Sequence, residues 1–453
     1  FDEENNNLIY KLKNFCIMTQ KKKSGNIIAI IAMIFLFGMI SFVTNLASPM
    51  GDVLKYQFGV ANWMGTLGVF ANFIAYAVMG YPAGKMLQNQ GYKKTALVAI
   101  AVGFVGVGIQ TISGFAGSFG IYLLGAFVAG FSMCLLNTVV NPMLNLLGGG
   151  GNTGNQLIQL GGSFNSLAGT AVIILTGVLL PSIAKAQISH VFPLMYAALA
   201  IFAFAFIVIL LTKIPEKEKS EVASIENSKY SPLSFRHFIL GAIGIFVYVG
   251  VEVGIPNVLN KWLQNPDLDV LQLRGVEGAE AIAGSVTATY WLLMLVGRLI
   301  GAAIGSKVSA RVMLGTASIL GLILVMSAIF ASPETMVNMP AFKNSPEGLF
   351  GIVNIPVNAM LLALCGLCTS IMWGGIFNLA VESLGKYTEQ ASGIFMILVC
   401  GGGILPLVQN GIVDLAGGIG YLTSYWLVIA LFAYLLFYAL VGCKNVNKDI
   451  PVE

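Results

Sequence analysis

Uncharged amide side chains recur at a helical spacing in the stretch LLNTVVNPMLNLLGGGGNTGNQLIQLGGSFNS, residues 135–166. Six of them are Asn137, Asn141, Asn145, Gln156, Gln159 and Asn165. Residues four apart advance about 400° around an α-helix, so the three asparagines share one stripe. A single amide of this kind usually joins two membrane helices by a hydrogen bond. Six on two successive segments favour a polar cavity, lined by groups that both donate and accept.

Two carboxylates lie in or at the end of apolar runs. Asp52 occurs in SPMGDVLKYQFG, and Glu252 occurs in YVGVEVGIPNVL. An ionisable group within a membrane helix is costly, is expected to face a wet cavity, and is a candidate proton carrier. Asp52 could instead form a surface pair with Lys55, and Glu252 could instead bond a neighbouring helix. We interpret both as proton-coupling candidates.

Aromatic residues and further amides fall in the same kind of run. They are Trp63, Tyr248, Tyr290, Trp291, Trp373, Asn378, Gln409 and Asn410. Apolar faces of sugars stack on aromatic rings, while sugar hydroxyls both donate and accept, as amides do. This combination indicates a site for a neutral polyhydroxyl compound. Tyrosine and tryptophan at helix ends are otherwise expected as anchors at the membrane surface.

These side chains must be positioned by membrane helices. The 453 residues are 57% hydrophobic and 10% charged, whereas soluble domains carry roughly 25% charged residues. Apolar runs of about 20 residues, the length that crosses a bilayer as a helix, recur twelve times. The predicted spans are 27–49, 60–84, 95–114, 119–146, 156–183, 192–213, 236–260, 282–305, 309–331, 355–383, 390–414 and 420–443. The expected fold class is an all-α membrane protein.

Lysine and arginine set the orientation, because they stay preferentially on the cytoplasmic side. With both termini inside, 19 of the 24 basic residues fall in inner segments, and five fall outside: Lys55, Lys185, Lys261, Arg274 and Lys343. The net charge of +4 therefore reflects topology and gives no reason to expect a nucleic-acid partner. We expect a multi-pass protein of a plasma membrane, the inner membrane of a bacterium.

The chain divides into two six-helix halves, 27–213 and 236–443, joined by a polar cytoplasmic linker, 214–235. Cytoplasmic tails cover 1–26 and 444–453, and translation is expected to begin at Met18, which leaves 1–17 upstream of the start.

The halves echo each other. Asn141 precedes Gly148 by seven residues, as Asn378 precedes Gly385. The glycines Gly80 and Gly84 of the second span correspond to Gly297 and Gly301 of the eighth. Glycines four apart let helices approach closely. A duplicated bundle of this kind is typical of transporters, whose sites lie near the bilayer midplane between the repeats.

Catalytic and metal chemistry find little support. Cys365 and Cys368 form a CxxC without nearby His, Cys or carboxylate to complete a metal site, and small packing residues are the better interpretation. His190 and His237 fall at predicted span ends, and no nucleophile–base pair is evident. We expect no enzyme, no metal and no cofactor.

Several motifs together resemble the major facilitator superfamily, and within it the fucose/galactose/glucose:proton symporter family. They are YPAGKMLQNQGYKKT, NTVVNPMLNLLG, GGSFNSLAG, YVGVEVGIPNVL, YWLLMLVGRLIGA and SIMWGGIFNLAVESLGKYTEQASG. The resemblance extends from Met18 onward. It implies twelve helices and H⁺-coupled uptake of a monosaccharide such as glucose, galactose or fucose. By the resemblance, Asp52 falls on the aspartate that carries the coupling proton.

The sequence departs from the family at four places. Asn137 stands where the family has a second coupling glutamate, and Gly162 replaces an expected glutamine. Gln88 and Asn89 replace the acid and base of a cytoplasmic loop signature, so a gating salt bridge is in doubt there. Asparagine cannot carry a proton, so Asp52 couples alone, or Glu252 helps, or the chain uses Na⁺ or no ion.

The resulting hypothesis is a monomeric sugar transporter that works by alternating access. Asp52 and Glu252 serve coupling, Gly80, Gly84, Gly297 and Gly301 serve helix packing, and the expected sugar ligands are Asn137, Asn141, Gln159, Asn165, Trp373, Asn378 and Asn410. An uncoupled facilitator remains open. A transporter of acidic or peptide-like solutes would need a buried cation, for which Arg298 is the one candidate; we place Arg298 near the cytoplasmic end of span eight, as a gating or anchoring residue.

Overall fold

The computed structural model describes residues 27–46, 57, 67–179, 187–216, 230–264, 279–345, 348–416, 420–447 and 449–452. The predicted tail 1–26, most of the predicted linker 214–235, Asp52, Lys55 and Trp63 lie outside the described residues.

The N-terminal bundle consists of the span Ile27–Leu46 and four labelled helices. These are α3 (Leu67–Ala116), α4 (Phe119–Leu147), α5 (Gly151–Leu179) and α6 (Ile188–Leu211). The long helix α3 contains two predicted spans joined end to end, with Gly91 in a non-helical conformation between them (φ 78°, ψ 177°). Glycine adopts this positive φ without the steric cost that a side chain brings, so Gly91 marks the junction of the two spans.

The C-terminal bundle follows η2 (Pro232–Ser234) and contains α8 (Arg236–Gln264), α9 (Ala279–Ile304) and α10 (Ala310–Phe330). Its last three spans are broken into shorter pieces. They are α11 (Val357–Ser370) with α12 (Met372–Val381); η3 (Gly385–Tyr387), α13 (Thr388–Ile397), η4 (Leu398–Cys400) and α14 (Gly401–Ala416); and α15 (Gly420–Thr423), α16 (Tyr425–Phe437) and η6 (Tyr438–Gly442). Breaks inside membrane helices are tolerated where neighbouring protein satisfies the freed backbone groups.

The described helices agree with twelve spans. Ten of them are long and apolar enough to cross a membrane. One of these, α3, holds two spans, and α5, with 29 residues, supplies the last. Large apolar side chains also face outward, among them Leu211, Phe330 and Leu415, which are 77%, 72% and 91% exposed. Apolar surface of this extent suits lipid rather than water.

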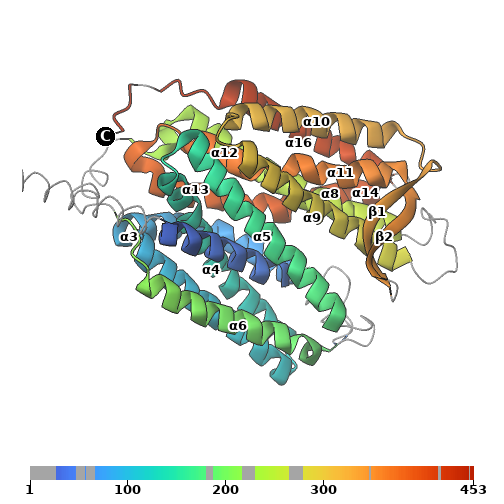
Figure 1. Ribbon diagram of the computed structural model, residues 1–453, viewed down its shortest axis with the longest axis horizontal. Coiled ribbons are helices and arrows are strands. Elements are labelled where there is room, and N and C mark those ends of the chain that lie inside the picture. Colours follow the sequence, from blue (N-terminus) through green and yellow to red (C-terminus); the bar gives the residue numbers. More distant parts are fainter. Residues whose placement is uncertain are drawn as a thin grey trace, which may run out of the picture.

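The C-terminus lies on the left in Figure 1. We call this the basic end, because basic residues contact neighbouring segments there: the backbone N–H of Lys386 donates to Val452, that of Arg236 donates to Asn447, and Tyr92, beside Lys93, donates to Glu389. In the same view the helices of the N-terminal bundle lie below those of the C-terminal bundle.

A two-stranded hairpin lies at the opposite end and was not predicted. Strands β1 (Met336–Ser345) and β2 (Gly348–Pro356) pair antiparallel, with Val337 opposite Ile355. The hairpin follows α10 and packs against α9. Its sequence contains Pro340 and Gly351, residues that weaken a strand pattern, so cross-strand pairing rather than local propensity accounts for it.

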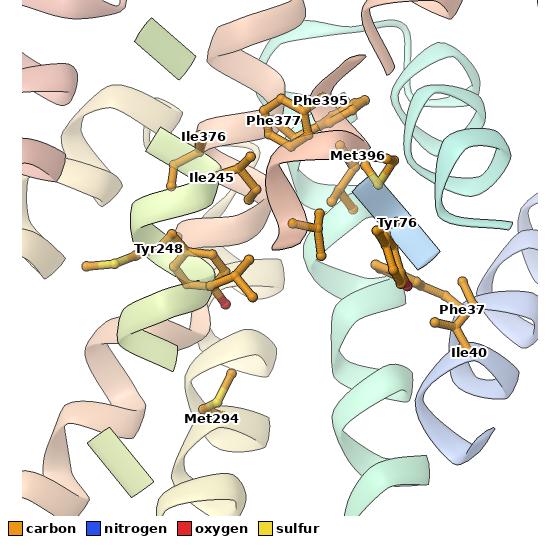
Figure 2. Packing of buried hydrophobic residues seen from close by; sticks show 14 of the residues in the cluster. Phe37, Ile40, Tyr76, Ile245, Tyr248, Met294, Ile376, Phe377, Phe395 and Met396 are labelled. Carbon is orange, nitrogen blue, oxygen red and sulfur yellow. The ribbon is translucent and has the colours of Figure 1, made fainter. Parts of the chain in front are cut away.

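The bundles meet in a continuous apolar core. A single cluster of buried residues includes Phe37 and Tyr76 from the N-terminal bundle and Tyr248, Phe377 and Phe395 from the C-terminal bundle, as Figure 2 shows. Because lipid tails are as apolar as leucine, close packing rather than escape from water must hold such helices together.

Glycines bring α3 and α13 into direct contact. A Cβ added to Gly80 would lie 2.8 Å from the Gly393 carbonyl oxygen, and one added to Gly84 would lie 3.0 Å from the Gly393 Cα. In the C-terminal bundle, a Cβ on Gly297 would lie 3.0 Å from the Leu367 carbonyl oxygen. A Cβ on Gly301 would lie 2.6 Å from Ile371 Cγ2, in the break between α11 and α12. All four glycines that we expected to serve helix packing therefore stand at close approaches.

We predict that Gly80→Ala lowers the thermal stability of the purified protein by a few degrees, because overpacking costs roughly 1–3 kcal/mol. Gly108→Ala, in the same helix, is the matched control, since a Cβ there meets nothing within 4 Å. It should leave the midpoint unchanged or raise it, because alanine favours helix by about 1 kcal/mol over glycine. Thermal unfolding in detergent measures both, and equal midpoints for the two variants would contradict the close contact.

Candidate functional site

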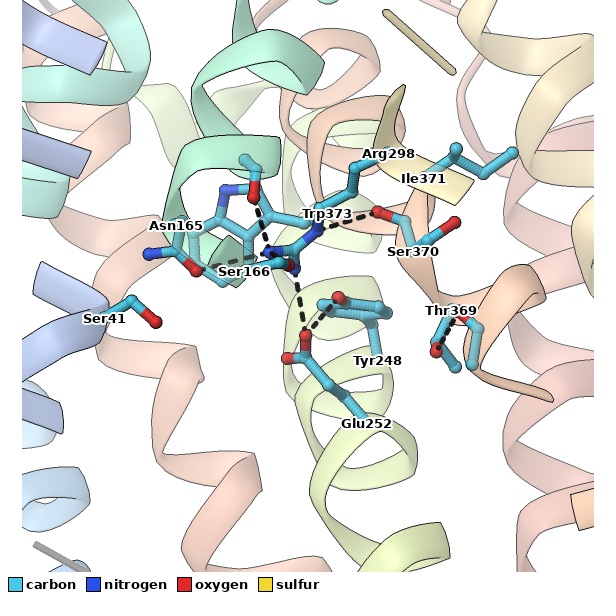
Figure 3. Close-up of polar contacts among 12 residues, drawn as sticks. Ser41, Asn165, Ser166, Tyr248, Glu252, Arg298, Thr369, Ser370, Ile371 and Trp373 are labelled. Atoms are coloured by element: carbon cyan, nitrogen blue, oxygen red, sulfur yellow. Dashed lines mark hydrogen bonds and ion pairs between the residues drawn. The ribbon is translucent and has the colours of Figure 1, made fainter. Parts of the chain in front are cut away.

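The guanidinium of Arg298, on α9, is the centre of a buried polar network (Figure 3). Its Nη1 donates to the Gly162 carbonyl oxygen (3.0 Å), to Asn165 Oδ1 (3.3 Å) and to Ser166 Oγ (2.7 Å), all on α5. Its Nε donates to the Ser370 carbonyl oxygen (3.2 Å) at the end of α11. The residue is 8% exposed. As an anchoring residue, our expectation for Arg298 was therefore wrong, because the side chain turns into the protein and joins the two bundles. Its alternative role as a gating residue stays a prediction.

Glu252 supplies the countercharge. Its Oε1 accepts from Arg298 Nη2 at 3.2 Å and from Tyr248 Oη at 2.7 Å. Tyr248 and Glu252 lie four residues apart on α8, so they face the same side of the helix. The Glu252 side chain keeps 14% of its surface exposed. The partner is an arginine, and this accounts for a carboxylate at this depth, because a buried charge needs a paired charge.

The absence of a side chain at position 162 makes room for the arginine. A Cβ on Gly162 would lie 3.3 Å from Arg298 Cδ and 3.5 Å from its Nε. A larger residue at this position, such as the glutamine that the resemblance implies, would occupy the space of the arginine side chain. Asn165, one turn further along α5, also donates from Nδ2 to the Phe37 carbonyl oxygen at 2.9 Å, which ties the network to the first span.

The amides of residues 135–166 form a polar seam between the bundles. Asn141 Oδ1 accepts from Trp373 Nε1 (2.9 Å), and Asn145 Nδ2 donates to Asn378 Oδ1 (2.9 Å). Gln156 and Gln159 donate to the carbonyl oxygens of Ala302 (2.9 Å) and Ile371 (2.8 Å). Asn165 meets Arg298, so five of the six amides singled out in the sequence bond the C-terminal bundle. In this arrangement the amides join helices by hydrogen bonds, which is the usual role of a single amide in a membrane bundle.

Asn137 stays within its own bundle. Its Nδ2 donates to Tyr76 Oη (2.9 Å) and to the Met133 carbonyl oxygen (3.1 Å). Asn141 in turn donates to the Asn137 carbonyl oxygen. A chain of hydrogen bonds therefore runs from Tyr76 through both asparagines to Trp373.

Asn410 lies apart from this group. Its Nδ2 donates to Asn257 Oδ1 (3.0 Å), and its Oδ1 accepts from Lys261 Nζ (2.8 Å). The structure thus brings together Asn137, Asn141, Gln159, Asn165, Trp373 and Asn378 along the seam, and puts Asn410 in a second polar cluster.

Aromatic rings border the ion pair. The rings of Tyr248 and Trp373 lie 6.3 Å apart at 61°, and those of Trp373 and Phe395 lie 6.3 Å apart at 84°. Tyr290 Oη lies 2.9 Å from Thr369 Oγ1. Edge-to-face rings hold one another in place, so Trp373 is fixed both through its ring and through its N–H.

A further inter-bundle contact lies at the basic end. Tyr92 Oη, just after the Gly91 kink, donates to Glu389 Oε1 of α13 at 3.2 Å. Glu216 accepts from the backbone N–H groups of Tyr92 (2.8 Å) and Lys93 (2.7 Å). The loop signature that has Gln88 and Asn89 in place of an acid and a base is therefore joined to the C-terminal bundle through a tyrosine.

Sequence reasoning missed Arg298, Gly162 and Ser166 as members of the site. An arginine within an apolar run requires a partner, and Glu252 was available. That signal could have paired them. Among the described residues, no three His, Cys, Asp or Glu side chains are grouped as a metal site.

Comparison with known proteins agrees with this architecture. A family model described as Major Facilitator Superfamily matches residues 28–406. The glucose/galactose transporter of Brucella abortus is 30% identical over 423 residues, which cover 92% of this chain and 94% of that protein. The L-fucose-proton symporter of Escherichia coli K12 is 22% identical, covering 83% and 86% of the two chains.

Solved structures share the fold. The crystal structure of the transporter FucP in the outward conformation covers 93% of this chain and all of its own, with a TM-score of 0.74 and 19% identity. The resemblance noted in the motifs and the predicted twelve-helix architecture are confirmed. The match covers most of the chain, and the chain belongs to the Major Facilitator Superfamily, a family of membrane transporters and not of enzymes.

Proposed function

We propose that the protein takes up a neutral monosaccharide of the glucose, galactose or fucose kind by alternating access, coupled to H⁺. The carrying observation is the chemistry of the seam: amides and aromatic rings surround one ion pair, Arg298–Glu252, whose charges cancel. Hydroxyl groups match such surroundings because they donate and accept without carrying charge. The names of the relatives, a glucose/galactose transporter and an L-fucose-proton symporter, support the same substrate class.

The position of the network supports a transport site. Glu252 and Ser166 stand near the middle of α8 and α5, and the Arg298 side chain, from the last third of α9, reaches both. Transporters built from repeats hold their substrates near the midplane, between the two halves. We propose that the predicted halves, 27–213 and 236–443, move against each other about this point, and that the protein works as a monomer.

Alternating access would require the seam to open at the basic end. Contacts there include Tyr92 with Glu389, Asn145 with Asn378, and Gly80 against Gly393. We propose that this end faces the cytoplasm of a bacterium, with both chain termini inside, and that the described arrangement is closed toward the cytoplasm. A substrate shifts the balance between such states only if it binds one of them better.

Coupling is assigned to Asp52, with Glu252 as the second carboxylate. Asn137 cannot exchange a proton, so the family's relay through span four has no carrier here. In the described arrangement Arg298 supplies the countercharge of Glu252. If opening the seam pulled Arg298 away, Glu252 would be a buried charge without a partner and would favour taking up a proton. Coupling to Na⁺ and uncoupled transport are the alternatives.

We predict that Asp52→Asn retains sugar exchange but loses uphill accumulation, because asparagine cannot bind and release the coupling proton at that site. Counterflow in proteoliposomes measures exchange, and accumulation under an imposed pH gradient measures coupling. Sugar-induced alkalinisation of the medium should occur with the unaltered protein and vanish in the variant. Glu334→Gln, at an exposed carboxylate, is the control and should behave as the unaltered protein. Proton-driven accumulation by Asp52→Asn would refute the assignment of coupling to Asp52. Na⁺-driven accumulation by the unaltered protein would show that the coupling ion is Na⁺ and not H⁺.

We also predict that Trp373 reports substrate binding. Trp373→Phe keeps a ring but removes the N–H that holds Asn141, so sugar affinity should fall by up to about tenfold, the value of one hydrogen bond. The sugar-induced change in tryptophan fluorescence should be lost with it. Trp426→Phe is the control, because Trp426 is 46% exposed on α16 and lies outside the seam. An unchanged fluorescence response in Trp373→Phe would remove Trp373 from the site.

A further inference from the structure

The ion pair at the centre of the site leaves two polar atoms without partners. Arginine carries five N–H groups. The Nε and Nη1 hydrogens of Arg298 meet Ser370, Gly162, Asn165 and Ser166, and one Nη2 hydrogen meets Glu252. The second Nη2 hydrogen has no acceptor among the described residues. Glu252 Oε1 takes both bonds to that carboxylate, and within the same part of the chain Oε2 takes none.

The pair is therefore joined by one hydrogen bond of 3.2 Å, not by the two parallel bonds of a full arginine–carboxylate fork. Arg298 thus keeps a free donor and Glu252 a free acceptor, on two charged groups that lie 3.2 Å apart. A sugar can accept from the first with one hydroxyl and donate to the second with the same or a neighbouring hydroxyl. A substrate carboxylate has no proton to donate, and it would place a second negative charge against Glu252.

The remaining contacts of Arg298 do not compete for such a ligand. Backbone carbonyls, the Asn165 amide and a serine hydroxyl carry no charge, so Glu252 is the group that neutralises the guanidinium in the described network. Without that carboxylate, the site would present a buried cation, and the best partner for a buried guanidinium is a carboxylate.

We propose that Glu252 determines the charge specificity of the transport site. It occupies, as an internal counter-ion, the place that the carboxylate of a sugar acid would take on Arg298, and it thereby restricts the site to neutral sugars. Specificity of this kind arises from a repulsive element built into the site as much as from attractive contacts. The proposal rests on the proposed function, since it concerns the site where a hexose would bind.

Competition binding on the full-length protein, purified and reconstituted in lipid nanodiscs, tests the idea. The probes are radiolabelled D-glucose and D-galactose. Each is competed with its uronate, which has a carboxylate at C6, and with the uncharged uronamide of the same shape. For the unaltered protein we expect the uronamide to compete and the uronate to be weaker by on the order of a hundredfold, since juxtaposed like charges cost several kcal/mol.

Three variants locate the effect. Glu252→Gln, nearly identical in shape and uncharged, should bind the uronate at least about tenfold better than the unaltered protein does. Glu252→Asp, which keeps the charge, is the matched control and should still exclude it. In the double variant Glu252→Gln/Arg298→Gln the gained uronate binding should disappear, because the cation that attracts the carboxylate is gone.

The outcomes separate the two proposals. If D-glucose, D-galactose and L-fucose all fail to bind the unaltered protein, the proposed function fails. If hexose binds but uronate competes as well as uronamide, or if Glu252→Gln binds hexose and still excludes uronate, the specificity proposal is overturned. Should Glu252→Gln not fold, the uronate and uronamide comparison on the unaltered protein still decides against the proposal when the two compete equally.

Discussion

A single guanidinium in an apolar bundle imposes the strongest constraint on this structure. Burying an unpaired arginine at membrane depth is costly, and Arg298 meets that requirement with one carboxylate, one hydroxyl, one amide and two backbone carbonyls drawn from α5, α8 and α11. The helices that contribute these groups belong to both bundles. Their relative placement is therefore linked to the position of one side chain, and any rearrangement of the bundles must give Arg298 new partners or leave it with fewer.

The amides extend this constraint along the seam. Asn141, Asn145, Gln156 and Gln159 each bond across to the C-terminal bundle, and every such bond exchanges for water or substrate if the bundles separate. The net free energy of a neutral hydrogen bond of this kind is only about 1 kcal/mol. A seam of many weak uncharged bonds can therefore open and close without a large penalty, in contrast to the ion pair at its centre. Glycine contacts such as Gly80 with Gly393 add close packing but no polar group that must find a new partner.

Much of the fold could be predicted from the sequence because spans depend on local apolar length, and the twelve runs correspond to the described helices. The hairpin β1–β2 was missed because its stability comes from cross-strand pairs, which a local pattern does not reveal. In the site, Asn141, Trp373 and Glu252 were selected by residue type, because polar groups are costly in a membrane span and are therefore expected to have a function. The role of Arg298 was missed because the residue lies near the end of its predicted span, whereas its long side chain reaches Glu252 and Ser166. Partners in three dimensions, such as Asn145 with Asn378, required the structure.

Gly162 carries a consequence for how this site can diverge among relatives. Because it has no side chain, it leaves the space in which the aliphatic part of Arg298 lies. A Cβ added to Gly162 would lie only 3.3 Å from Arg298 Cδ. The orientation of the Arg298 side chain therefore depends on the size of the residue at position 162. In a relative with a long side chain at position 162, the arginine stem must shift to make room, and with it the positive charge that Glu252 now neutralises. Positions 162 and 298 should therefore be conserved together or change together in evolution, because together they determine where the positive charge of the site lies.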